Sequence, residues 1–118
     1  MPRTDQAPRR SAYLPEQIDL YVEHCLATET VPRVSELADF LGMSREHLSR
    51  EFAAKHKLPL SAYLKNRQLD AARRLLVESS LSTTRVAYLC GFGTRRTFYR
   101  TFRRETGMSP ATFRRCHR

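Results

Sequence analysis

The sequence is poor in glycine and cysteine and has no long apolar run, and each shortage excludes a class of protein. Only 4 glycines occur in 118 residues, of which 41% are hydrophobic and 28% charged, so a largely disordered chain is excluded. The 3 cysteines are odd in number and form no CxxC pair, which predicts neither a disulfide framework nor a metal site. No segment reaches the roughly 20 apolar residues that cross a bilayer, and the amino-terminal MPRTDQAPRRSAY is not a secretory signal. The sequence therefore predicts a globular cytoplasmic protein without a cofactor.

Acidic residues are scarce in the second half of the chain. Residues 1–59 hold 8 Lys and Arg against 9 Asp and Glu, whereas residues 60–118 hold 13 against 3. Five arginines fall within GFGTRRTFYRTFRRETGMSP, residues 91–110, where Phe98 and Phe102 lie one helical turn apart. This segment is typical of a helix with an apolar back and a cationic front. Such a charge distribution favours a nucleic-acid partner over an anionic membrane, because the aromatic back is needed for the helix's own core.

The first half of the chain predicts a tail followed by short helices. Residues 1–14 hold three arginines and are expected to form a flexible basic tail, with a helix starting at Pro15. Further on, Ser35 is a candidate N-cap, Gly42 is a candidate helix stop, and Ser44 is the expected N-cap of REHLSREFAAKH. This order of helix, short turn and helix is typical of a helix-turn-helix unit.

The same pattern returns about fifty residues later in the chain. LADFLGMSREHLSREF, residues 37–52, aligns with VAYLCGFGTRRTFYRTF, residues 86–102, which has one extra residue in its turn. The matched residues are Ala38 with Ala87, Gly42 with Gly91, Met43 with Phe92, Leu48 with Phe98, Arg50 with Arg100, and Phe52 with Phe102. Alanine allows a close helix crossing, glycine provides the positive φ of the turn, and the large apolar residues fill the angle between the helices. The pattern indicates an internal duplication.

Between the two copies lies SAYLKNRQLDAARRLLVE, residues 61–78, whose apolar residues recur at helical spacing without glycine or proline. Eighteen residues at 1.5 Å each form a rod of about 27 Å. One turn of DNA measures about 34 Å. We expect this rod to present the second helix of each unit to successive major grooves on one face of the duplex.

Two such units joined by a long helix, with turns ADFLGM and AYLCGF and a terminal GMSPATFRR, resemble the DNA-binding domain of the AraC/XylS family of bacterial transcription regulators. The resemblance covers about residues 16–115. It implies an all-α fold of about seven helices. Two homeodomain-like helix-turn-helix subdomains, residues 15–60 and 79–118, would flank the linker helix 61–78.

The resemblance also implies a function. It predicts a sequence-specific regulator that binds double-stranded DNA as a monomer in the bacterial cytoplasm, at the nucleoid. An activator that recruits RNA polymerase is favoured over a repressor. The chain could be a stand-alone regulator or the DNA-binding part of a longer sensor, and its start at Met1 favours the first.

In a helix-turn-helix, the N-terminal half of the second helix enters the major groove. For the second unit this selects five candidate DNA-binding residues: Thr94, Arg95, Arg96, Thr97 and Arg100. Arg96 and Arg100 are the candidates for guanine contacts, while Thr94 is expected to cap the helix and meet a phosphate. Arg103 and Arg104 are expected to add non-specific charge.

The first unit offers a less basic face. Its candidates are Arg45, Glu46, Ser49 and Arg50, with Ser44 beside a phosphate. Arg50, the repeat partner of Arg100, is the foremost candidate for a base contact. Glu46 has two open interpretations, because it could accept a hydrogen bond from cytosine or favour the helix N-terminus through the helix dipole.

Four residues depart from the family pattern. Lys57 stands where glycine is usual, Gln68 where arginine is common, Thr83 where an aliphatic residue is usual, and Arg85 where glutamate is usual. We expect the turn at Lys57 to be either strained or differently shaped, and we expect the loss of an ion pair or a phosphate contact at Gln68.

One rival function is a non-specific architectural nucleic-acid-binding protein, which would bind through charge alone. An enzyme is not predicted. Cys116 beside His117 could suggest a methyl-acceptor site, but its place at the chain end leaves no room for an enclosing pocket.

Overall fold

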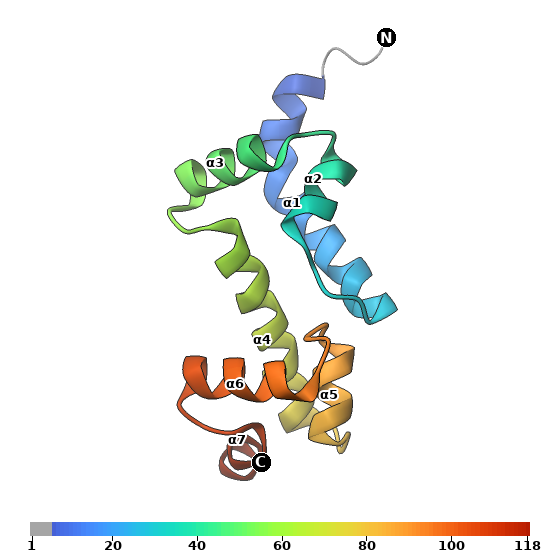
Figure 1. Cartoon of the computed structure of the whole chain (residues 1–118), viewed down its shortest axis with the longest axis vertical. Helices are drawn as coiled ribbons and strands as arrows, with labels where there is room; N and C mark the ends of the chain where they lie inside the picture. The colour runs from blue at the N-terminus through green and yellow to red at the C-terminus, as the bar shows by residue number, and fades with distance from the viewer. Residues whose placement is uncertain (1–5) are drawn as a thin grey trace.

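The computed structural model describes the backbone of residues 6–118 and the side chains of residues 15–118, and it contains seven α-helices and no strand in this range (Figure 1). The first unit comprises α1 (Gln6–Thr28), α2 (Val34–Leu41) and α3 (Arg45–His56). The long helix α4 (Leu60–Glu78) leads to the second unit, which comprises α5 (Thr83–Leu89), α6 (Arg95–Thr106) and α7 (Pro110–His117). The predicted all-α class, with two helix-turn-helix units joined by a long helix, is confirmed. In the described part of the chain, no helix is both long and apolar enough to cross a membrane.

The expected helix start at Pro15 is wrong, because α1 begins at Gln6 and contains Pro15. The residues just before Pro15 include alanine, arginine and leucine, which are good helix formers. Their helix propensity favours continuing the helix before Pro15, although a proline inside a helix costs about 3 kcal/mol. Residues 1–5 of the expected basic tail, and the side chains of residues 6–14, lie outside the described part of the structure.

The expected N-cap at Ser35 is also wrong. Helix α2 begins at Val34, and Arg33 occupies the N-cap position without a side-chain cap bond. Tyr21 of α1 takes over this role, because its hydroxyl accepts a hydrogen bond from the Arg33 N–H at 2.9 Å and donates one to Glu36 Oε1 at 2.6 Å. A side chain from a neighbouring helix therefore fixes the start of α2.

Two hydrophobic clusters form the interior, one for each unit. The first is built on buried residues of α1, α2 and α3 and includes Leu60 and Leu64 of α4. The second is built on α5 and α6 and includes Leu69 and Leu76 of α4. Because α4 contributes to both clusters, its two ends are held by separate cores. Leu26, near the end of α1, packs against both.

The duplication seen in the sequence is present in the packing. Phe52 contacts Tyr63 with ring centroids 5.3 Å apart, and Phe102 contacts Phe113 at the same 5.3 Å. Fully burying a side chain such as Phe102 stabilises the fold by about 1.5–3 kcal/mol. Each unit is therefore closed by an equivalent aromatic pair.

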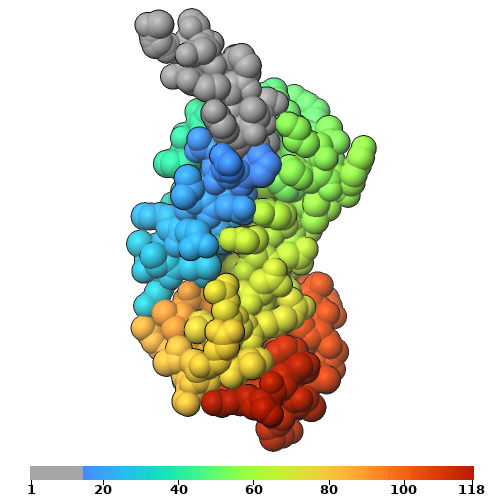
Figure 2. Space-filling view, turned by 180° about the vertical axis from the view of Figure 1, so that it is seen from behind, coloured from blue at the N-terminus to red at the C-terminus, as the bar shows by residue number. Residues whose placement is uncertain are grey.

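The two units lie at opposite ends of α4. Figure 1 shows α3 and α6 on the same side of α4 and running roughly parallel to each other. Figure 2 shows the opposite face, where α4 is visible between the first unit and the second. The second helix of each unit is thus presented on one common side of the molecule.

Candidate nucleic-acid interface

The helix α6 is formed and oriented by its caps and its apolar back. Thr94 is the N-cap, as expected, and its hydroxyl accepts a hydrogen bond from the Thr97 N–H at 3.0 Å. Gly107, with φ 79°, ends the helix in the left-handed conformation. Phe98 and Phe102 are fully buried, so the polar face of α6 points away from the core.

That polar face carries a cluster of positive charge. A shallow hollow along α6 is lined by Arg95, Arg96, Tyr99, Arg100 and Arg103. Among the described residues, no hydrogen-bond or ion-pair partner occurs for the guanidinium groups of Arg96, Arg100 and Arg103. Their hydrogen-bond donors are consequently available to an anion or to base edges.

Arg95 is held differently from its neighbours. Its guanidinium lies 4.4 Å from the centroid of the Tyr99 ring, and Nη2 donates to the Tyr99 hydroxyl at 3.4 Å. The same hydroxyl hydrogen-bonds to Thr83 Oγ1 at 2.7 Å. These contacts, which include a cation–π interaction, orient the Arg95 side chain. Tyr99 is not among the residues predicted from the sequence, although an arginine four residues before a tyrosine on a helix is a detectable signal.

Arg104 lies outside this group. It does not line the hollow, and its Nε is 3.5 Å from Glu105 Oε2. Of the two arginines expected to act non-specifically, Arg103 thus joins the cationic face, whereas Arg104 faces a carboxylate.

Helix α3 presents the corresponding face of the first unit. Ser44 caps it by accepting a hydrogen bond from the His47 N–H at 3.1 Å. Arg45, Glu46 and Arg50 are exposed, and Ser49 is half-buried. Neither arginine has a partner within residues 15–118.

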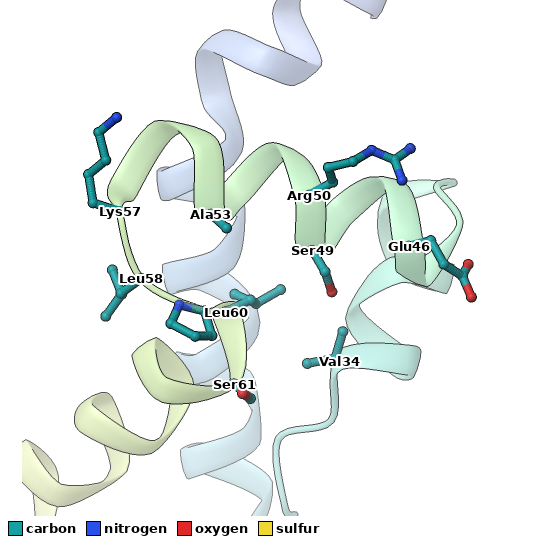
Figure 3. Close-up of a pocket in the computed structure, with 10 residues that line it drawn as sticks. Val34, Glu46, Ser49, Arg50, Ala53, Lys57, Leu58, Leu60 and Ser61 are labelled. Carbon is teal, nitrogen blue, oxygen red and sulfur yellow. The ribbon is translucent and has the colours of Figure 1, made fainter.

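A hollow beside α3 brings most of these residues together (Figure 3). Its lining includes Glu46, Ser49 and Arg50, with Val34 opposite and Lys57 near the far end of the helix. Arg45 is not part of this lining. The α3 face mixes a carboxylate and a hydroxyl with its cations, whereas the hollow on α6 has no carboxylate in its lining.

The residues that depart from the family pattern have structural roles. Lys57 adopts the left-handed conformation with φ 63°, which agrees with the expected strain. Gln68 is buried, and its Nε2 donates to the Cys90 and Gly91 carbonyls at 3.1 and 2.9 Å. In place of the ion pair or phosphate contact that an arginine could make at this position, Gln68 makes hydrogen bonds that fix the turn between α5 and α6.

Comparison with known proteins identifies relatives over most of this region. A family model described as a helix-turn-helix domain matches residues 37–116. An HTH-type transcriptional regulator of Mycobacterium tuberculosis is 37% identical over 82 residues, which are 70% of this chain and 32% of that protein. The HTH-type transcriptional activator RhaS of Yersinia pestis is 38% identical over 79 residues, 67% of this chain and 29% of the relative. The chain thus spans about a third of the length of these curated relatives.

Solved structures share the fold. The DNA-binding domain of AdpA, a global transcriptional factor in complex with a target DNA, aligns with a TM-score of 0.72 and 31% identity, over 86% of this chain and 93% of that one. The C-terminal domain of the response regulator yesN of Fusobacterium nucleatum aligns with a TM-score of 0.78 and 24% identity, over 86% and 97%.

Two linked helix-turn-helix units, each with an exposed polar second helix, are typical of a DNA-binding domain. The chain belongs to the AraC/XylS family of transcription regulators, as its sequence motifs predicted.

Proposed function

We propose that this chain recognises a bipartite, asymmetric site in double-stranded DNA as a monomer, with α3 in one major groove and α6 in the next. The parallel placement of α3 and α6 on one side of α4 supports this arrangement (Figure 1). The 19 residues of α4 make a rod of about 28 Å, close to the length of one DNA turn, about 34 Å. The two faces differ in charge, so the two half-sites differ in sequence.

The second unit provides most of the affinity. The observation that carries this proposal is the set of three arginines on α6, Arg96, Arg100 and Arg103, which have no partner in the described part of the chain. Arg96 and Arg100 are four residues apart and contact guanine O6 and N7, each contributing about 1–3 kcal/mol of discrimination. Arg95 and Arg103 neutralise phosphates at the edges of the groove.

Two threonines and Arg104 have smaller roles in this unit. Thr94 and Thr97 lie at the helix N-terminus, where hydroxyl and N–H groups meet a phosphate. Arg104 adds long-range charge only.

The first unit adjusts specificity. Arg50 contacts a base edge, and Arg45 binds the backbone beside the capping residue Ser44. Glu46 and Ser49 line the hollow next to Arg50, where they accept or donate hydrogen bonds to the adjacent base pair. The affinity of the first unit for its half-site should therefore depend less on salt concentration than the affinity of the second unit for its own.

The regulatory outcome we propose is activation by recruitment of RNA polymerase at the bacterial nucleoid. A relative that is 38% identical over 79 residues is named a transcriptional activator, which supports this direction. Transcription in vitro from a promoter carrying the selected site, with purified bacterial RNA polymerase, tests it. An increase with added protein is expected, and a decrease would contradict activation.

Selection of bound sequences from random duplexes, followed by competition with unrelated DNA, tests the DNA-binding proposal. We expect two conserved blocks and a preference of about 10³ or more over random DNA at physiological salt. A non-specific architectural protein would show no such ratio at any salt concentration. That outcome would refute sequence-specific recognition.

A further inference from the structure

The end of α1 has an unusual backbone. Glu29 adopts φ 58°, in the left-handed region where glycine is the usual residue. The Thr30 N–H donates to the Cys25 carbonyl at 2.9 Å and the Glu29 N–H to the Leu26 carbonyl at 3.4 Å, which is the Schellman pattern. A glutamate therefore occupies a position that costs backbone strain, so a compensating role for its side chain is expected.

The Glu29 carboxylate joins the two units. Arg85 of α5 donates to it through both terminal nitrogens, Nη1 to Oε1 at 3.0 Å and Nη2 to Oε2 at 3.0 Å. The pair is bidentate, which restricts the relative orientation of the two groups more than a single bond would. Figure 2 shows the end of the first helix against the beginning of the second unit.

A close backbone contact lies next to this pair. A Cβ atom on Gly91 would come within 2.7 Å of the Thr30 carbonyl oxygen and 3.2 Å of Pro32 Cδ. Gln68 of α4 holds the Gly91 carbonyl at 2.9 Å from the other side. The loop between α1 and α2 thus packs directly on the turn that leads into α6.

Helix α1, which ends next to this contact, is itself anchored to α4. Asp19 of α1 accepts a hydrogen bond from the Tyr63 hydroxyl at 2.6 Å, and Arg67 lies 3.7 Å from Asp19 and 3.6 Å from Glu23. Burial, with a smaller contribution from the bond to Asp19, raises the pKa of Tyr63 to about 12, so the phenol keeps its proton at neutral pH. With α1 fixed on α4, a contact between α1 and α5 prevents the second unit from turning about the end of α4.

We infer that the contact of Glu29 with Arg85, together with the packing of Thr30 on Gly91, fixes the separation of α3 and α6 and thereby sets the number of base pairs that the protein accepts between its two half-sites. The inter-unit contact consists of Glu29, Thr30, Arg85 and Gly91. They are positioning residues that act through the two recognition helices. This inference rests on the proposed bipartite recognition of DNA.

Two substitutions remove the ion pair without harming the local fold. Glu29→Gly places glycine at a left-handed position that favours it. Arg85→Glu places glutamate three residues after Ser82, whose hydroxyl already accepts the Arg85 N–H at 3.0 Å, and so completes a capping box. If the separation of α3 and α6 is no longer fixed in either variant, the cause is therefore not a weakened helix.

The test measures Kd for duplexes whose gap between half-sites is the selected length or is longer or shorter by one base pair. Wild-type protein is expected to discriminate against the altered gaps, and each single variant should reduce that discrimination by up to about fivefold, the range of a partly exposed ion pair. The combined variant Glu29→Arg with Arg85→Glu should restore it. Arg73→Glu is the matched control, because it makes the same charge change in a pair that lies within α4, 2.8 Å from Asp70. Unchanged gap preference in both single variants would overturn the inference.

A second measurement does not depend on DNA. Spin labels at Ala54→Cys on α3 and Glu105→Cys on α6, in a Cys116→Ser background, report the distance between the two exposed helix faces. A narrow distance distribution is expected for the wild-type pair, and a broader one with Glu29→Gly. An unchanged distribution would overturn the inter-unit contact itself, whereas the absence of a bipartite site in the wild-type protein would refute the proposed function instead.

Discussion

Replacing Arg100 or Arg104 by alanine separates base recognition from general attraction to DNA. Arg100 lines the cationic hollow and, within the described residues, has no protein partner, whereas Arg104 lies outside the hollow and 3.5 Å from Glu105. Arg100→Ala should remove a bidentate contact to guanine, which is worth about 1–3 kcal/mol. The Kd for the selected site should therefore rise roughly 5- to 150-fold. On a duplex with that guanine replaced, the loss should be much smaller.

Arg104→Ala should behave differently. It should weaken all duplexes by a similar factor, because long-range charge carries no sequence information, and the effect should shrink as the salt concentration rises. The free energy of unfolding of both variants should stay within about 0.5 kcal/mol of the wild-type value, because both side chains are exposed. Fluorescence anisotropy over a set of single-base variants at several salt concentrations measures these effects. Equal effects of the two substitutions on every duplex would refute the assigned roles.

Three further predictions concern stability and thiol chemistry. In urea titrations, Gly91→Ala should lower the free energy of unfolding more than Gly42→Ala. Both glycines have positive φ, but of these two positions a Cβ meets atoms within 4 Å at Gly91 alone, so equal losses would contradict the close packing. Lys57→Gly should raise the free energy of unfolding by about 0.5–1 kcal/mol, since left-handed strain of roughly 1–2 kcal/mol exceeds the entropic cost of glycine; a lower Tm would refute this. Native protein should expose one reactive thiol, Cys116, because the other two are buried and burial raises the pKa of Cys90 to about 12; two or more fast-reacting thiols would contradict the core assignment.

The local features of the recognition helices could be predicted from the sequence. The helix Arg45–His56 has the predicted bounds, and Ser44 and Thr94 cap α3 and α6. Gly42 ends α2 in the left-handed conformation. These features depend on residues within one or two turns of each other, so helical periodicity and capping preferences are enough to find them.

The contacts that fix the units relative to one another could not be predicted in this way. Glu29 and Arg85 are 56 residues apart, and Gln68 reaches a carbonyl 23 residues away. Tyr21 replaces the expected serine cap of α2 from 12 residues upstream. Each of these contacts depends on the packing of separate helices, which the local sequence pattern does not contain. The same is true of Glu29, where no glycine signals a left-handed turn.

Guanine-methylation interference on the selected duplex tests the central claim most directly, because it maps major-groove contacts made by both recognition helices at once. Two blocks of interference on one face of the DNA, about 10 base pairs apart, with one protein bound per duplex, are the expected result. The block that α6 contacts should lose one position in Arg100→Ala. A single short block, or two protein copies on one site, would contradict recognition by two linked helix-turn-helix units of one chain.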